Sequence, residues 1–347
     1  MNVLLPPTPP QRPLPCFNDA RTVAQSLNTP TVVCVGTFDG VHLGHWAILQ
    51  HGRSLADELR LPLWVLSFHP HPKTIVHPER APRLLTEPDE RVALFAACGA
   101  DGILMLRFDQ QLAQTPARDF AEEVLAKQLQ AAAIVVGADF GFGHDREGNA
   151  EFLRAWGKDN RCPVEVVGMI PGDRESEWVS SSVIRRCLEN GEFARALRLL
   201  GHPYPVTGRV QPGAGRGRQL GYPTWNLTLS DVKLPPPVGV YAGWTNRLTP
   251  RPVMAYYGFP PTFEEQTARL EVHVLEGEDS DRAPQAVETI WLAEFVRSEV
   301  RFVRAEQLMR QLAEDERAVR ARLTHIRSEG STGTATSKER REQTSAG

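Results

Sequence analysis

The sequence predicts a doubly wound parallel α/β domain followed by a small antiparallel β-barrel and a C-terminal helix. Three observations lead to this fold class. Residues 31–170 alternate continuously apolar runs with longer segments of helical period, which is typical of strands buried on both faces and joined by crossover helices. Beyond residue 200 the runs are short, alternate in polarity and are separated by Pro and Gly, as in a small barrel. The stretch 304–323 returns to a helical period.

Each apolar run of the first half is expected to form one strand of a single sheet. The expected strands are 31–36, 62–68, 102–108, 132–140 and 163–170, and the expected helices are 45–60, 90–99, 117–130 and 151–160. Ligands of such sheets bind beyond the carboxyl ends of the strands. The residues that follow 31–36, 62–68 and 132–140 are therefore expected to carry the function.

The second half is expected to contain four strands and a final helix. The strands are 204–210, 238–244, 251–258 and 269–276, and the helix is 304–323. Between the halves, residues 180–204 favour two short helices that are broken near Asn190-Gly191.

We place the domain boundary near residue 187, which defines domains 16–187 and 188–327. Residues 1–15 are rich in proline, and residues 328–347 contain no Leu, Ile, Val or Phe. Neither end can offset its ordering entropy by burying apolar surface, so both ends are expected to be disordered.

Charge and cysteine usage exclude several classes of protein. The chain has 39 Lys plus Arg and 42 Asp plus Glu, a net charge of −3, so it lacks the positive excess of a dedicated nucleic-acid binder. No apolar run approaches the roughly 18 residues of a membrane span, so no membrane partner is expected. The five cysteines form no CxxC pair, which argues against a disulfide framework and favours the cytoplasm.

The first functional pattern lies where the run 31–36 ends. A Gly-rich turn, Gly36 to Gly40, leads into His42-Leu43-Gly44-His45 at a predicted helix start, where free backbone N–H groups and the helix dipole favour phosphate. His42 and His45 share one face of the first helical turn. A bare HxxH is more often a pair of surface residues, and a zinc site with His69, His71 or His144 is the other alternative. The strand-turn-helix context favours phosphate.

Two weaker patterns lie in the second half. Residues 213–218 form a Gly-rich loop without the GK[ST] of a Walker loop, and a flexible hairpin is the simpler interpretation. In the run 269–276, alternation places Glu271 on the face opposite Leu270 and Val272, where a glutamate is usually only a solvated charge.

Four motifs of the first half resemble those of bacterial FAD synthetases. Gly36 to His45 closely resembles the GxFDGxHxGH signature of the nucleotidyltransferase superfamily, whose fold is Rossmann-type. Phe68-His69-Pro70-His71-Pro72 is similar to F-x-P-x-P, Gly137 to Gly143 to G-x-D-F-x-F-G, and Ser180 to Arg185 to S-S-T-x-I-R, with serine in place of threonine.

This resemblance implies roles for individual residues. His42 and His45 are expected to be catalytic. The residues expected to bind ATP are Gly36, Phe38, Asp39, Gly40, Gly44, Ser181, Ser182 and Arg185, and those expected to bind FMN are Phe68, Pro70, Pro72, Asp139 and Phe140.

The second half resembles riboflavin kinases. Residues 213–226 are similar to G-x-G-R-G-x-x-L-G-[FY]-P-T-x-N, which implies that Thr224 and Asn226 hold Mg²⁺ and nucleotide. Glu271 matches the glutamate of the E-V-H strand, the general base for the ribityl 5′-hydroxyl. The residues that the resemblance assigns to the nucleotide are Gly213, Gly215, Arg216, Gly217, Arg218, Thr224 and Asn226.

Both halves occur in the order of bifunctional bacterial riboflavin kinase/FAD synthetases, which implies the substrates ATP, riboflavin and FMN and the cofactor Mg²⁺. The chain departs from the family at Tyr256-Tyr257, at Arg282-Ala283-Pro284 and at Trp225. Two alternatives stay open: an FAD synthetase whose barrel is a degenerate kinase, and a flavin-sensing protein that has lost catalysis. The oligomeric state is not predicted.

Overall fold

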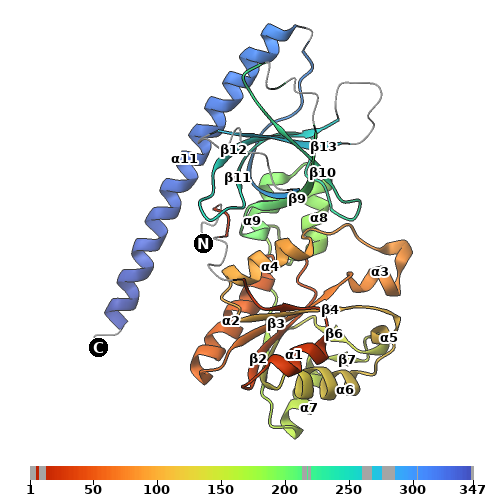
Figure 1. Cartoon of the computed structure of the whole chain (residues 1–347). Helices are drawn as coiled ribbons and strands as arrows, with labels where there is room; N and C mark the ends of the chain where they lie inside the picture. The colour runs from red at the N-terminus through yellow and green to blue at the C-terminus, as the bar shows by residue number, and fades with distance from the viewer. Residues whose placement is uncertain are drawn as a thin grey trace. The chain divides into compact units, whose positions relative to one another are not determined.

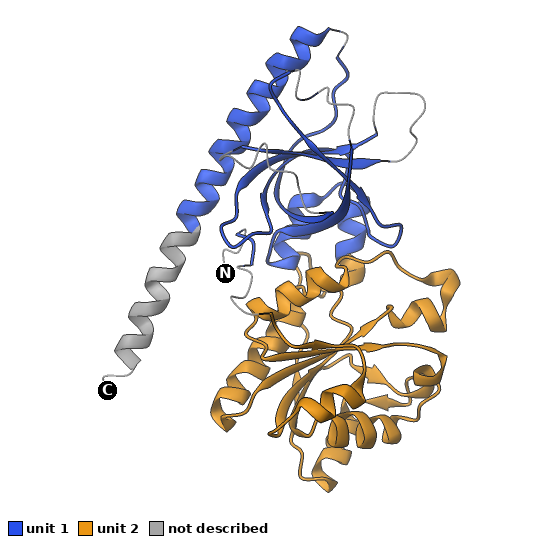
Figure 2. Cartoon of the chain, in the orientation of Figure 1, with its two compact units in different colours: residues 1–8, 184–347 blue, residues 9–183 orange. Residues whose placement is uncertain are grey.

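The computed structural model describes residues 5–7, 13–212, 217, 220–259, 268–275, 286–302 and 304–344. The chain divides into two compact units (Figure 2). Unit 1 comprises residues 1–8 and 184–347, and unit 2 comprises residues 9–183.

Unit 2 is built on a six-stranded parallel sheet of order β1-β4-β3-β2-β5-β8. Its strands are β1 (Cys16–Phe17), β2 (Thr31–Val35), β3 (Leu63–His69), β4 (Gly102–Arg107), β5 (Ala131–Gly137) and β8 (Val164–Val167). The predicted parallel α/β fold is confirmed. The edge strand β1 was missed, because two residues are too short to show a periodicity.

Helices cover both faces of this sheet (Figure 1). They are α1 (Ala20–Ser26), α2 (Leu43–Leu59), α3 (Pro72–Val76), η1 (Pro78–Arg80), α4 (Pro88–Ala97), α5 (Gln110–Ala113), α6 (Ala117–Asp119), the π-helical η2 (Phe120–Gln128), η3 (His144–Arg146) and α7 (Ala150–Asp159). A two-stranded ribbon pairs β6 (Gly141–Phe142) with β7 (Gly148–Asn149). Alternate residues of β2 divide between the faces: Val33 packs with α1, η2 and α7, whereas Cys34 faces α2.

The order of the strands creates a switch point at β2. The chain passes from β2 to β3 and β4 on one side, and then returns to place β5 on the other side of β2. In open α/β sheets, ligands bind at such a point, beyond the carboxyl ends of the strands. The loops after β2, β3 and β5 therefore meet at one edge.

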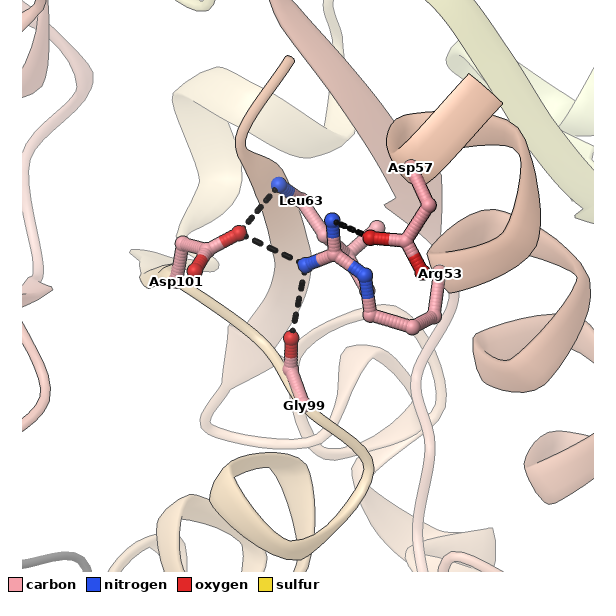
Figure 3. Close-up of polar contacts among 5 residues, drawn as sticks. All are labelled: Arg53, Asp57, Leu63, Gly99 and Asp101. Atoms are coloured by element: carbon pink, nitrogen blue, oxygen red, sulfur yellow. Dashed lines mark hydrogen bonds and ion pairs between the residues drawn. The ribbon is translucent and has the colours of Figure 1, made fainter. Parts of the chain in front are cut away.

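At the opposite end of the strands, where β3 and β4 begin, Arg53 of α2 forms a polar network (Figure 3). Its guanidinium donates to the carbonyl of Gly99 at 3.0 Å and to Asp101 at 2.7 Å, and pairs with Asp57 at 2.8 Å. Asp101 also accepts from the backbone N–H of Leu63 at 2.8 Å. This network ties α2 to the starts of β3 and β4.

The barrel of unit 1 is closed and antiparallel, with strand order β10-β13-β12-β11-β14-β9. Its strands are β9 (Tyr204–Gln211), β10 (Trp225–Leu229), β11 (Gly239–Thr245), β12 (Pro252–Gly258), β13 (Arg269–Val274) and β14 (Val287–Arg297). The predicted barrel is confirmed, but β10 and β14 were missed. β14 closes the barrel between β9 and β11, and two register shifts in its pairing with β11 interrupt the alternation that identifies a strand.

The described part of unit 1 also contains the helices α8 (Ser181–Glu189), which begins in unit 2, α9 (Phe193–Leu200) and α11 (Ala305–Thr344). α11 packs on β11, β12 and β14. Arg297 of β14 donates two hydrogen bonds, of 2.8 and 2.7 Å, to the buried carboxylate of Asp315 on α11. α11 continues to Thr344, beyond the end of the folded segment that the sequence predicts at residue 327. Among the described residues, no helix is both long and apolar enough to cross a membrane.

The contact between α2 and β2 leaves no room for a side chain at Gly52. A Cβ there would lie 2.2 Å from Sγ of Cys34, which is fully buried. Overpacking costs about 1–3 kcal/mol, and the gain in helix propensity offsets roughly 1 kcal/mol of this cost, so Gly52→Ala should destabilise unit 2 by up to about 2 kcal/mol. Urea denaturation, with hydrogen exchange of the β2 amides to assign the transition to unit 2, measures this loss.

Removing the sulfur makes room for the new methyl group. Cys34→Ala in the Gly52→Ala background should therefore recover about 1 kcal/mol of coupling energy in a double-mutant cycle. Strictly additive effects of the two substitutions would show that the contact is not limiting.

Candidate active sites

The turn after β2 has a backbone shape that few sequences adopt. Phe38, Gly40 and Val41 have φ values of 51°, 85° and 38°, in the left-handed region. Gly36 allows the Phe38 ring to fold back over the turn, since a Cβ there would lie 2.9 Å from ring Cζ. The buried Phe38 ring contacts His45 edge to face, with centroids 5.2 Å apart. The turn therefore fixes the direction in which the chain enters α2.

His42 and His45 lie together at that helix start, as the spacing predicts. Their rings stack with centroids 3.6 Å apart and planes 18° apart, and Nδ1 of His42 caps α2 by accepting from the backbone N–H of His45 at 3.4 Å. A Cβ at Gly44 would lie 3.2 Å from the His42 ring. The absence of a side chain at Gly44 therefore leaves room for the His42 imidazole at the N-terminus of α2.

The electrostatics favour a neutral His45. Burial lowers the pKa of its imidazole well below the ordinary value, and the charges of His42 and Arg91 lower this pKa further. Its Nδ1 is buried without a hydrogen-bond partner. A buried, unpartnered polar atom beside a helix N-terminus is suited to meeting an anionic ligand.

Asp39 faces the protein interior. It is 2% exposed, and its carboxylate accepts from the backbone N–H of Thr86 at 2.9 Å and of Leu85 at 3.2 Å. The hydroxyl of Thr86 accepts from the N–H of Gly40 at 2.8 Å. These bonds anchor the turn to the segment before α4. The predicted contact of Asp39 and Gly40 with ATP stays a prediction.

Ser181 reaches the same turn. Its hydroxyl donates to the carbonyl of Asp39 at 2.8 Å, and Ser180 accepts from the backbone N–H of Val183 at 3.4 Å. Ser182 and Arg185 also lie on α8. Ser182 belongs to unit 2, whereas Arg185 belongs to unit 1. The structure thus joins Ser181 to the turn that carries His42.

The residues predicted to bind FMN lie at the end of β3 or follow β3 and β5. Phe68 is buried, with its ring against Phe108 and Phe120, so the structure makes it a core residue. Pro70 follows a cis peptide bond after His69, and Pro72 begins α3. Asp139 is exposed just after β5, and Phe140 stacks on Phe142 with centroids 5.2 Å apart.

One buried residue of this site was missed. Arg91 of α4 is 2% exposed and donates to oxygens in the segments that follow β2 and end β3. The signal in the sequence is its spacing of three and four residues from Leu94 and Phe95, which places an arginine on the buried face of the predicted helix.

Among the described residues, no group of three or more His, Cys, Asp or Glu side chains could hold a metal ion, so nothing supports the zinc alternative. His71 caps α3, with its Nδ1 accepting from Lys73 at 3.2 Å, and His144 lies beside the carbonyl of Ala113 at 3.4 Å. These histidines have separate local partners.

The Gly-rich loop of unit 1 is described only at Gly217, and Gly213, Gly215, Arg216 and Arg218 lie outside the described residues. The carbonyl of Gly217 accepts from the backbone N–H groups of Leu220 and Tyr222, at 3.1 and 2.8 Å. A Cβ at Gly217 would lie 2.3 Å from the Tyr222 carbonyl and 3.2 Å from the Thr224 hydroxyl. The backbone therefore passes directly over Thr224.

Asn226 and Glu271 are brought together by strand pairing. Asn226 of β10 lies opposite Glu271 of β13, which lies opposite Tyr256 of β12. Residues opposite each other share a face of the sheet, so the three form a row. The Glu271 side chain is 30% exposed and pairs with Arg269 at 3.1 Å.

His273 holds the turn before β10 and was also missed. Its Nδ1 lies 2.8 Å from the carbonyl of Pro223, and its ring meets the Tyr222 ring at a centroid distance of 5.1 Å. The E-V-H strand therefore supplies both Glu271 and a support for the turn that carries Thr224.

The structure accounts for two departures from the family pattern. Tyr256 donates its hydroxyl to Glu299 and folds over Gly258, where a Cβ would lie 2.1 Å from the hydroxyl. Burial, then Glu299 and Glu271, raise the pKa of Tyr256. Trp225 is buried beneath Arg247, whose guanidinium lies 5.6 Å from the ring centroid. Arg282 to Pro284 lie outside the described residues.

Comparisons with known proteins match both units. The FAD synthetase family model matches residues 24–183, and the riboflavin kinase family model matches residues 200–323. The bifunctional riboflavin kinase/FMN adenylyltransferase of Escherichia coli K12 is 33% identical over 300 residues, covering 86% of this chain and 94% of its own. The enzyme of that name from Pseudomonas fluorescens is 35% identical over 301 residues, covering 84% and 92%.

A solved structure from Streptococcus pneumoniae, described as a macrolide-efflux protein, matches with a TM-score of 0.72 at 29% identity. It covers 89% of this chain and 99% of its own. The two family models in series and the curated relatives above 30% identity agree on the family. The chain belongs to the bifunctional riboflavin kinase/FMN adenylyltransferase family.

Proposed function

We propose that the barrel phosphorylates riboflavin to FMN with ATP, and that unit 2 then transfers AMP from a second ATP to FMN, giving FAD and pyrophosphate. The observation that carries the first reaction is the Asn226–Glu271 pair across β10 and β13. The observation that carries the second is the stacked His42–His45 pair at the start of α2, beside the switch point of the sheet.

The adenylyl transfer needs no enzyme nucleophile, because the FMN phosphate attacks the α-phosphorus of ATP and pyrophosphate leaves. Charge accumulates on the α-phosphoryl oxygens in the transition state. His42, His45 and the N-terminus of α2 offer hydrogen-bond donors there, and Ser181 assists from the start of α8. Donors that are already held in place stabilise this charge without reorganisation at the moment of reaction.

The kinase step needs a base for an alcohol. Glu271 would accept the proton of the ribityl 5′-hydroxyl as that oxygen attacks the γ-phosphorus, and ADP leaves. The ion pair with Arg269 holds the carboxylate of Glu271 in one orientation. Phosphoryl transfer depends mainly on positioning and charge neutralisation, which such a fixed row of side chains supplies.

The residues present fit Mg²⁺. Asn226 of β10 lies opposite Glu271, and Thr224 lies two residues before Asn226, in the segment that leads into this strand. Hydroxyl and amide oxygens are hard ligands of the kind that Mg²⁺ accepts beside substrate phosphates. When bound, the ion would neutralise the triphosphate.

The alternative of a degenerate kinase barrel is not favoured. The riboflavin kinase model spans residues 200–323, and the pairing of Asn226 with Glu271 across β10 and β13 supports an active barrel. Tyr256 stands beside Glu271 without displacing it from the row. We also place the enzyme in the cytoplasm, which the five free cysteines support.

Glu271→Gln should abolish FMN formation from riboflavin and leave FAD formation from supplied FMN unchanged, because only the base of the barrel is removed. Product analysis by chromatography, with riboflavin or FMN as the substrate, measures both steps. Glu294→Gln is the matched control, since Glu294 is also a strand glutamate of the barrel paired with an arginine, Arg322, at 3.3 Å. Phosphorylation that survives in Glu271→Gln would show that the base lies elsewhere.

His45→Asn should lower kcat for FAD formation by about 10²–10³-fold, as the loss of one transition-state donor does in other enzymes. The same chain should still phosphorylate riboflavin at its normal rate. His51→Asn serves as the control, because His51 lies on the same helix but is largely exposed beside Glu165. Equal losses in the two variants would contradict a local role for His45.

Chelation of divalent metal should stop both reactions, and added Mg²⁺ should restore them. Asn226→Ala should raise the Mg²⁺ concentration that gives half-maximal riboflavin phosphorylation about tenfold, the equivalent of roughly 1.4 kcal/mol. FAD formation should keep its normal Mg²⁺ dependence. In the control Asn246→Ala, which removes the barrel asparagine bonded to Trp291, neither dependence should move.

A further inference from the structure

Arg91 is a buried cation whose hydrogen bonds all go to neutral oxygens. One nitrogen, Nη1, donates to the carbonyl of Thr37 at 3.1 Å, the hydroxyl of Ser67 at 3.0 Å and the carbonyl of Phe68 at 3.0 Å. Nε is buried without a partner. Arginine keeps its charge in proteins, so this positive charge persists where it is only 2% exposed.

The three acceptors belong to the ends of two neighbouring strands. Thr37 lies in the turn after β2, and Ser67 and Phe68 end β3, just before His69 and Pro70. Ser67 also donates to the Thr37 carbonyl at 2.9 Å, which closes the link between the two segments. Arg91 therefore joins the turn before His42 to the segment that leads into Pro70 and Pro72.

The helix that carries Arg91 is itself held to the turn. Glu87 and Glu90 form a capping box at the start of α4, and Asp39 binds the backbone of Leu85 and Thr86 just before it. The turn is thus connected to α4 at two points, Asp39 and Arg91. Because both connections are buried, a shift of α4 would move the turn and the end of β3 together.

We propose that Arg91 is a positioning residue of the adenylyl-transfer site, which holds the ATP-binding turn in register with the FMN-binding segment and adds fixed positive charge beneath both. The inference rests on the proposed roles of these segments. Attack of one phosphate on another requires the two substrates to be aligned, and a misplacement of about 1 Å costs on the order of 10²-fold in rate. The connected backbones are those that would hold the two substrates.

The charge of Arg91 also acts on the histidines beside the segments. Burial is the largest cause of the lowered pKa of His45 and of His69, and the charge of Arg91 lowers both pKa values further. The groups that face His45 are His42 from α2, Arg91 from α4 and the uncharged Phe38 ring from the turn. Removing a cation makes protonation of a nearby imidazole easier, so the pKa of His45 should rise when Arg91 is replaced by a neutral residue.

The test compares Arg91→Met with Arg91→Lys in the full chain. Arg91→Met should lower kcat for FAD formation about 10²-fold and raise KM for both ATP and FMN, because both segments lose their register. Arg91→Lys keeps the charge and should recover kcat to within about tenfold of the unmodified enzyme. Riboflavin phosphorylation by the same samples should be unchanged, which reports an intact barrel.

Arg53→Met is the matched control within unit 2. Arg53 also bridges a helix and two strands and also has a buried, unpartnered Nε, but it lies at the opposite edge of the sheet (Figure 3). Its loss should lower the unfolding temperature and leave both KM values unchanged. Equal KM changes in Arg53→Met and Arg91→Met would overturn the proposal.

The charge is tested separately by nuclear magnetic resonance titration of His45. Its pKa should rise in Arg91→Met and stay near the normal value in Arg91→Lys; equal values in the two variants would overturn the role of the charge. If Arg91→Met lowers kcat through partial unfolding alone, KM for both substrates stays normal, and the positioning role is wrong.

The His45→Asn variant separates this inference from the assignment of the site. If His45→Asn forms FAD normally, the site itself is misassigned. If His45→Asn is impaired and Arg91→Met behaves as the unmodified enzyme, only the inference about Arg91 fails.

Discussion

Parallel pairing of β2 with both β3 and β5 is the constraint on which unit 2 depends. Parallel strands end at the same edge, so three loops that lie far apart in the chain converge there. The edge carries the N-terminus of α2, which His42 caps, and the His42–His45 pair. The opposite edge carries the polar network of Arg53. The proposed adenylyl-transfer site and the Arg53 network therefore lie at opposite ends of the strands of one sheet.

The two units reach related chemistry by different means. In the proposed sites, unit 2 offers backbone N–H groups at a helix start, whereas the barrel offers side chains aligned across β10, β13 and β12. In both, the chemistry is phosphoryl or nucleotidyl transfer, in which positioned charge matters more than a reactive side chain. A chain of net charge −3 can bind polyphosphates because helix N-termini and a few local cationic side chains suffice without an overall positive excess.

Much of the fold could be predicted because long apolar runs and helical periods are local signals. β10 and β14 escaped prediction for physical reasons. β10 begins directly after a proline-containing turn, and β14 is interrupted by register shifts against β11. The site was predicted through motifs, so residues outside them were missed. Arg91 lies outside the motifs. His273 lies within the E-V-H motif but was assigned no role, because its contact with the backbone of a segment distant in sequence leaves no short pattern.

The sequence by itself determined the two fold classes, their order and the family, because periodicity and contiguous motifs depend on neighbours along the chain. Only the tertiary structure decided which way the motif side chains face. It turned Asp39 inward to Leu85 and Thr86, placed Phe68 in the core and set Tyr256 beside Glu271. The physical reason is that burial and pairing depend on contacts between residues distant in sequence, which no local pattern encodes.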